Sequence, residues 1–295
     1  MFFCREYLEN PFYLCPVKAK VMTNNECVKP VYIEQLFKSK NPGLAKWIPG
    51  FVYSYLKKII HQNDINDFIG RYGDRQGLAF SDAILEYLNV SYRVVGEENL
   101  PAADGRYIFV SNHPLGGPDG IILISFLGTR YPELKFPVND LLLNLKNLNT
   151  IFLPVNKHGV QAKDAVAAIE KAYASDCQMI MFPAGMVSRK QNGEIKDLEW
   201  QKSFISKAIQ HKRDIVPVYI DGKNSNFFYN LANFRKKIGL KANLEMFYLP
   251  DETFKQRNKA FTLYIGKPVS WQTFDRSRRP MEWAQEIKEM VYQLK

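Results

Sequence analysis

The sequence predicts an α/β protein with a mostly parallel central sheet flanked by helices and preceded by an N-terminal helical segment. After about residue 90, short runs rich in β-branched and aromatic residues alternate with helical segments, a pattern typical of parallel sheets. The 295 residues, of which 46% are hydrophobic, suffice for one large core. We expect an N-terminal helical segment over residues 1–75 and an α/β domain over residues 76–295.

The N-terminal segment contains an amphipathic helix in its second half. Apolar residues recur at spacings of three and four along residues 44–60, and Pro49 either begins or kinks this helix. One interpretation packs the apolar stripe on the core of the protein. The other places the helix in the headgroup region of a membrane, with Trp47 and Tyr53 near the interface.

The remaining elements follow from hydrophobic periodicity. Helical spacing predicts helices over residues 64–72, 79–89, 162–175, 200–212 and 280–294. Short apolar runs predict strands over residues 92–96, 106–111, 150–155, 178–183, 215–220, 244–249 and 261–266.

Composition narrows the class of function. The four cysteines are dispersed without a CxxC pair, and the four histidines are equally scattered, so we expect neither a disulfide framework nor a metal centre. The net charge of +10, with basic clusters at residues 234–241 and 276–279, suits nucleic acid, anionic lipid or an acidic substrate. No nucleic-acid-binding motif accompanies it, which favours lipid or a phosphorylated substrate.

The chain shows no segment that would span a membrane. The start of the sequence carries charges and a proline where a signal peptide would be apolar. The longest uninterrupted apolar run, residues 121–127, is far shorter than the roughly 20 residues needed to cross a bilayer. We expect no transmembrane helix.

Two loops of unusual composition each follow a predicted strand. The sequence NHPLGGPDG follows the strand over residues 106–111, and PAGMVSR follows the strand over residues 178–183. In open α/β sheets the chemistry collects at the carboxyl ends of the strands, so these loops are the candidate functional site.

The first loop pairs a potential base with a carboxylate. A histidine can accept a proton near neutrality, and a carboxylate can orient its ring and stabilise the imidazolium. Gly116 and Gly117 permit the turn that would bring Asp119 back to His113. There is no GxSxG nucleophile elbow, so we expect His113 to deprotonate a hydroxyl or amine of a bound substrate. A merely hydrogen-bonded loop is the alternative.

The order of these motifs resembles that of the glycerolipid, or lysophospholipid, acyltransferase family. NHPLGGPDG, FPAGMVSR and IVPV follow one another over about residues 90–222, as the Asn-His, Phe-Pro-x-Gly and Val-Pro blocks do in that family. HPLGG, FPAG and DLEWQKSF are most similar to the bacterial hemolysin-like branch associated with ornithine- or glycine-lipid synthesis.

The resemblance implies a role for each motif position. His113 would be the general base and Asp119 its partner. The substrate-binding positions would be Asn112, Gly116, Gly117, Pro183, Gly185, Ser188 and Arg189. Gly185, Ser188 and Arg189 would form an anion-facing loop, since a guanidinium binds phosphate bidentately. Lys157, in the loosely aligned NKHG segment, is a weaker phosphate ligand.

Two departures from the family pattern bear on the acceptor. Five residues separate His113 from Asp119, where four are usual in the family. Ala184 stands where the family commonly has glutamate. The second departure disfavours a lysophosphatidate acceptor and favours a variant one.

We therefore expect an acyltransferase that moves a fatty acyl group from an acyl thioester, carried by acyl carrier protein or coenzyme A, to a lysolipid hydroxyl or amine. No bound cofactor and no nucleic acid are expected. The resemblance and the basic surface imply a cytoplasmic enzyme, peripheral on the anionic inner face of the cytoplasmic membrane. A lipid esterase or hydrolase, and a non-catalytic membrane-associated lipid-binding protein, are the alternatives.

Overall fold

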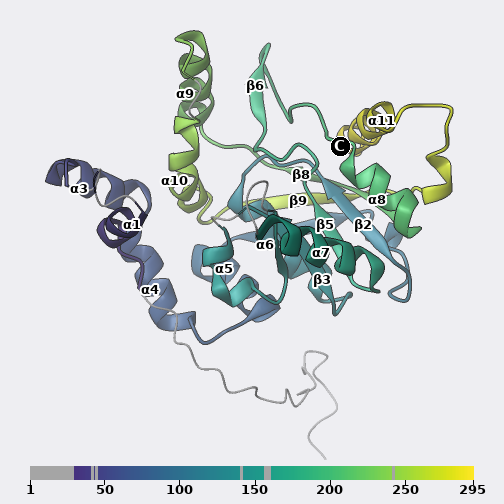
Figure 1. Cartoon of the computed structure of the whole chain (residues 1–295), viewed down its shortest axis with the longest axis horizontal. Helices are drawn as coiled ribbons and strands as arrows, with labels where there is room; N and C mark the ends of the chain where they lie inside the picture. The colour runs from purple at the N-terminus through teal and green to yellow at the C-terminus, as the bar shows by residue number, and fades with distance from the viewer. Residues whose placement is uncertain (1–29, 41–42, 44–45, 140–141, 156–160, 241–242) are drawn as a thin grey trace, which may run out of the picture.

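A seven-stranded, mostly parallel sheet forms the centre of the protein (Figure 1). The structure is a computed structural model that describes residues 30–40, 43, 46–139, 142–155, 161–240 and 243–295. The strands lie in the order β1 (Ser91–Val95), β9 (Ala260–Ile265), β8 (Asp214–Asp221), β2 (Tyr107–Ser111), β5 (Gln178–Met181), β3 (Leu134–Val138) and β4 (Phe152–Pro154). Neighbouring strands are parallel except for β8 and β9.

Helices cover both faces of this sheet. On one face lie α5 (Gly77–Leu88) and α6 (Gly117–Gly128), with α4 (Gln62–Tyr72) packed against α5. On the other lie α7 (Gln161–Ala174), α8 (Ser203–His211) and α11 (Pro280–Tyr292). The alternation of β2 shows the division, since Phe109 packs in the first core and Ile108 in the second. The α/β architecture predicted from the sequence is confirmed.

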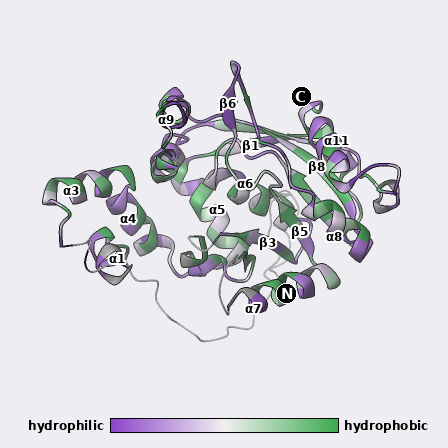
Figure 2. Ribbon diagram, turned by 45° about the horizontal axis from the view of Figure 1, so that its top comes forward, coloured by the Kyte–Doolittle hydropathy of each residue, from purple (hydrophilic) through white to green (hydrophobic). Residues whose placement is uncertain are grey.

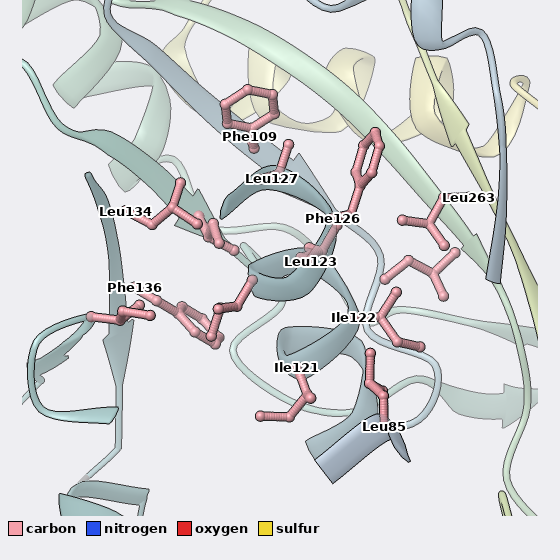
Figure 3. Close-up of a cluster of buried hydrophobic side chains, with 14 of the residues drawn as sticks. Leu85, Phe109, Ile121, Ile122, Leu123, Phe126, Leu127, Leu134, Phe136 and Leu263 are labelled. Atoms are coloured by element: carbon pink, nitrogen blue, oxygen red, sulfur yellow. The ribbon is translucent and has the colours of Figure 1, made fainter. Parts of the chain in front are cut away.

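The helix α6 is the centre of the first core. Residues 121–127 are all buried, between α5 and the strands, and Figure 3 shows Ile122, Leu123 and Phe126 among side chains from several elements. A helix that is apolar on every side has no 3.6-residue periodicity, which explains why the sequence showed only an apolar run here.

Between β8 and β9 the chain forms a cap of helices. It consists of α9 (Asn226–Lys237), the 3₁₀ helix η4 (Leu244–Tyr248) and α10 (Leu249–Phe254). The strand predicted at residues 244–249 is therefore wrong. The alternation in LEMFYL suggested a strand, but Glu245 is buried between two arginines and Pro250 begins a helix.

Three further elements were absent from the prediction. They are β3, α9 and a small antiparallel hairpin formed by β6 (Arg189–Gln191) and β7 (Glu194–Lys196). The strand β3 contains Lys135 and Pro137, which weaken its apolar pattern. Its apolar alternate residues, Leu134, Phe136 and Val138, are buried.

At the N-terminus, α1 (Ile33–Lys40), α3 (Gly50–Ile59) and α4 project from the sheet on the side where α9 and α10 lie (Figure 1). Pro49 begins α3 at its N-cap and does not kink it. Tyr53 is buried, whereas Trp47 and Phe51 are 86% and 75% exposed. No helix in the described part of the chain is both long enough and apolar enough to cross a membrane.

Replacing Leu123 with alanine should destabilise the protein by about 3 kcal/mol, because it leaves a cavity inside a closely packed helix face. Chemical denaturation of the wild type and the variant measures this loss. Val166→Ala, at an exposed position of α7, is the matched control and should cost about 0.5 kcal/mol or less. An equal effect of the two substitutions would contradict the central place of α6.

Candidate active site

His113 lies just beyond the carboxyl end of β2, at the edge of the sheet where β5 and β8 also end. The preceding residue fixes this position. The buried Asn112 side chain donates to the carbonyl of Ile220 at 3.0 Å and accepts the Ile220 N–H at 2.7 Å. Asn112 thus extends the pairing of β2 with β8, and the chain turns at His113.

The imidazole of His113 contacts the carboxylate of Asp119. His113 Nδ1 lies 2.9 Å from Asp119 Oδ2, although the approach lacks the alignment of a hydrogen bond. Such contacts often tighten only when substrate is bound. The loop with five intervening residues therefore brings the two side chains together. Nδ1 is buried and the side chain is 18% exposed, so its accessible part lies elsewhere on the ring.

Asp119 occupies the first turn of α6 and is completely buried. Its Oδ2 also accepts the N–H groups of Leu115 at 2.9 Å and Gly116 at 3.0 Å. Burial raises the pKa of Asp119, and the contact with His113 and the two N–H donors oppose that shift. One carboxylate therefore closes the loop, caps the helix and contacts the ring.

The two loop glycines have different roles. Gly116 has φ +90°, and a Cβ there would lie 3.1 Å from a side-chain atom of Leu249 and 3.2 Å from one of Val187. Gly117 is exposed at the start of α6, and its N–H donates to no described residue. Gly116 thus allows close packing of the cap, while Gly117 presents a free donor.

The second loop supports the histidine ring from β5. Phe182 stacks on His113 with ring centroids 4.2 Å apart and an interplanar angle of 22°. The buried Pro183 accepts the N–H of Gln201 through its carbonyl, and Gly185 turns the chain with φ +64°. The ring is thereby held between an aromatic side chain and a carboxylate.

Ser188 and Arg189 are buried and already have partners. The Ser188 hydroxyl donates to Asp197 Oδ1 at 2.5 Å, and Arg189 Nη2 donates to Glu245 Oε1 at 2.9 Å. Arg235 binds the same carboxylate, and this pairing keeps the pKa of Glu245 low although burial would raise it. An anion could reach these groups only by displacing those partners, so the structure shows no anion-facing pair here.

Asp197 connects the two loops by accepting hydrogen bonds from both of them. Its Oδ1 accepts the backbone N–H of His113 at 3.2 Å as well as the Ser188 hydroxyl, and its Oδ2 accepts the Trp200 indole N–H at 2.9 Å. The carbonyl of His113 in turn accepts the N–H of Ser188 at 2.8 Å. A buried carboxylate with this many donors fixes the backbone of the histidine.

The family model described as acyltransferase matches residues 35–295. The chain belongs to the acyltransferase family. It is 52% identical over 263 residues to the lyso-glycine lipid O-acyltransferase of Bacteroides thetaiotaomicron, covering 89% of this chain and 96% of that protein. It is 49% identical over 263 residues to the protein of the same name from Phocaeicola vulgatus, covering 89% and 94%.

Among solved structures, the 1-acyl-sn-glycerophosphate acyltransferase PlsC from Thermotoga maritima aligns with a TM-score of 0.45 at 21% identity. The alignment covers 88% of this chain and 86% of that one. The family and the relatives make this protein an acyltransferase, as the motif order predicted. They do not support the hydrolase or the non-catalytic alternative.

In this acyltransferase, Phe182 and Asp197 are the site residues that the sequence analysis did not single out. Both lay within motifs that carried the resemblance, FPAG and DLEWQKSF, and that was the available signal. Ala184 is buried in the apolar core beneath α8 and α11, so a glutamate there would enter an apolar environment. Lys157 lies outside the described residues.

The described part of this acyltransferase contains no group of three or more histidine, cysteine, aspartate or glutamate side chains that could hold a metal ion.

Asp119→Asn should reduce kcat/KM by about 10²- to 10⁴-fold, because a neutral amide does not stabilise an imidazolium. The fold should survive, since an amide oxygen still accepts the two N–H groups. Steady-state kinetics and thermal unfolding measure the two effects.

The same variant tests the pKa of Asp119. Because that pKa is raised on folding, the folded wild type takes up the proton at a higher pH than the unfolded chain and gains stability as pH falls through this interval. The variant lacks this gain. An unfolding free energy with the same pH dependence in both proteins, compared between about pH 4 and 7, would show that the carboxyl titrates normally.

Proposed function

We propose that the protein transfers a fatty acyl group from an acyl thioester, of acyl carrier protein or coenzyme A, to the hydroxyl of a lyso-glycine lipid. The observation that carries this proposal is the buried Asp119 carboxylate 2.9 Å from His113 at the edge of the sheet. Two relatives at about 50% identity bear the name lyso-glycine lipid O-acyltransferase, which supports this acceptor.

His113 acts as the general base. Its Nε2 takes the proton of the acceptor hydroxyl while the oxygen attacks the thioester carbonyl, forming a C–O bond. The tetrahedral intermediate collapses, the C–S bond breaks, and the departing sulfur receives the proton from the imidazolium. Asp119 stabilises the positive ring through Nδ1, and the stacked Phe182 keeps the ring plane fixed during both transfers.

The N–H of Gly117 serves as a donor to the oxyanion. It is exposed, stands at the positive end of the α6 dipole, and has no partner among the described residues. The N–H of Gly116 is already bound to Asp119, so it is unsuited to this role.

The acceptor headgroup follows from what the second loop lacks. Ala184 lies in the apolar core, and Ser188 and Arg189 are engaged by Asp197 and Glu245, so neither Ser188 nor Arg189 is free to bind a phosphate. This environment favours an acceptor without a phosphate over lysophosphatidate. In this proposal Ser188 and Arg189 shape the acceptor side of the site and do not clamp an anion.

We further propose that the enzyme acts as a peripheral protein on the inner face of the cytoplasmic membrane, where acyl thioesters and the lipid acceptor meet. The outward side chains of Trp47 and Phe51 and the lysines Lys57 and Lys58 of α3 support attachment to an anionic surface.

His113→Ala should lower acyl transfer by about 10³-fold or more while leaving the fold intact. Purified protein is incubated with a thioester whose acyl group is labelled, carried by acyl carrier protein or coenzyme A. The acceptors offered are lyso-glycine lipid, lyso-ornithine lipid and lysophosphatidate. His211→Ala, which replaces a half-buried histidine at the end of α8 away from the catalytic loop, is the matched control. Transfer that survives the loss of His113 rejects the mechanism, and label released only as free fatty acid would favour the hydrolase.

Replacing Trp47 and Phe51 together with serine should weaken binding to phosphatidylglycerol vesicles by about tenfold or more, since two large apolar side chains no longer enter the interface. Vesicle flotation measures the bound fraction. The melting temperature should not change because both side chains are exposed. Unfolding of the variant would instead place these residues in a core.

A further inference from the structure

The cap helix α9 carries apolar residues on two different faces. Phe228 and Tyr229 are buried against Val187 and Leu249. Phe227, Phe234 and Ile238 are exposed, at 48%, 60% and 59%. Their spacing of seven and four residues aligns them in one stripe along the helix. This outward stripe is not explained by packing.

The stripe continues onto the segment that follows α9. Exposed apolar side chains recur in the turn and in η4, and together with the stripe they form what we call the cap face: Phe227, Phe234, Ile238, Leu240, Leu244 and Phe247. Isolated exposed hydrophobic residues are ordinary, but a cluster on neighbouring elements such as α9 and η4 marks an interaction surface.

Basic residues accompany the cap face. Lys236 and Lys237 lie in the last turn of α9, directly between Phe234 and Ile238 in sequence. Their neighbour Arg235 points inward to Glu245, so the two lysines are the exposed positive charges of this turn. The helical repeat places Lys237 beside the stripe and Lys236 on the opposite side of α9. Aromatic side chains with a flanking lysine suit the interface of an anionic bilayer better than the acidic surface of a carrier protein.

The cap face adjoins both α3 and the catalytic loop. The hydroxyls of Tyr55 in α3 and Tyr248 in η4 lie 2.6 Å apart. Next to Tyr248, Leu249 packs over Gly116 of the catalytic loop. Figures 1 and 2 show α3 and α9 on the same side of the molecule, and Figure 2 shows hydrophobic and hydrophilic residues interleaved along α3.

We propose that the cap face is a second membrane-docking element, which binds the anionic lipid surface together with α3 and so holds the catalytic loop against the bilayer. Its occupant is the lipid–water interface itself. This inference rests on the proposed function insofar as it assigns the surface to delivery of a lipid acceptor. Contact of the bilayer with both α3 and the cap face would fix the orientation of the enzyme on the membrane, whereas contact with α3 alone would allow the enzyme to rotate about that helix.

The test uses the full-length double variant Phe234→Ser/Phe247→Ser with vesicles of phosphatidylglycerol and phosphatidylcholine. Binding to the anionic vesicles should weaken by about tenfold or more, while Val166→Ser on α7 should bind as the wild type does. Lys237→Gln should weaken binding by about fivefold on anionic vesicles only. Unchanged vesicle binding of the phenylalanine variant overturns the proposal.

Activity separates this inference from the proposed function. With lyso-glycine lipid dispersed in detergent, the phenylalanine variant should match the wild type, and with the same lipid in vesicles it should lose about tenfold in rate, as its binding does. Wild-type protein without turnover in detergent would reject the proposed function and leave the vesicle-binding result standing. Intact vesicle binding together with weakened affinity for acyl carrier protein would assign the cap face to a protein partner and overturn the proposal.

Discussion

The burial of Asp119 is the constraint on which the site depends. A carboxylate with no exposure at the start of an apolar helix needs local partners. Asp119 Oδ2 has them in two loop N–H groups and the ring of His113, whereas Oδ1 has no hydrogen-bond partner among the described residues. Because α6 is buried on every side, its first turn cannot shift without disturbing the core (Figure 3). The packing of the core around α6 therefore also sets the orientation of the His113 ring, because Asp119 belongs to the first turn of that helix. This coupling also explains why the loop tolerates an extra residue: the contact is set by the helix, and the intervening loop adapts.

Two more buried carboxylates organise the surrounding chain in a similar way. Asp197 joins the backbone of His113 to Ser188 and Trp200, and Glu245 joins the hairpin that begins at Arg189 to the cap through Arg235. Each is surrounded by donors, as a buried charge requires. The loops around His113 are thus held by hydrogen-bonded networks in which most polar side chains already have partners. A site of this kind is suited to a reaction that needs one positioned base and a donor to the oxyanion, and the chemistry expected from an acyltransferase needs no more.

The second loop departs from the usual family motif at Ala184, and its surroundings show what this departure does to the charge of the site. Ala184 lies in an apolar core, and Arg189 is neutralised by Glu245, so the second loop offers little positive charge to an acceptor. The positive charge of the chain is instead spread over its surface, including the lysines of α3 and α9. In the proposed function, this charge serves attachment to an anionic surface more readily than recognition of a phosphate on the acceptor.

The sequence by itself determined the α/β class, most strands and helices, and the pairing of His113 with Asp119, because these depend on periodicity and on short motifs that act locally. The sequence did not reveal α6 as a helix or η4 as a helical turn. The first is apolar throughout, and the second owes its conformation to a buried glutamate whose partners, Arg189 and Arg235, are distant in sequence. Only the tertiary structure decided that Phe182 supports the ring, that Asp197 holds its backbone, and that Arg189 faces inward. These roles arise from contacts between loops that follow different strands, and no local pattern encodes which loops meet at the edge of a sheet.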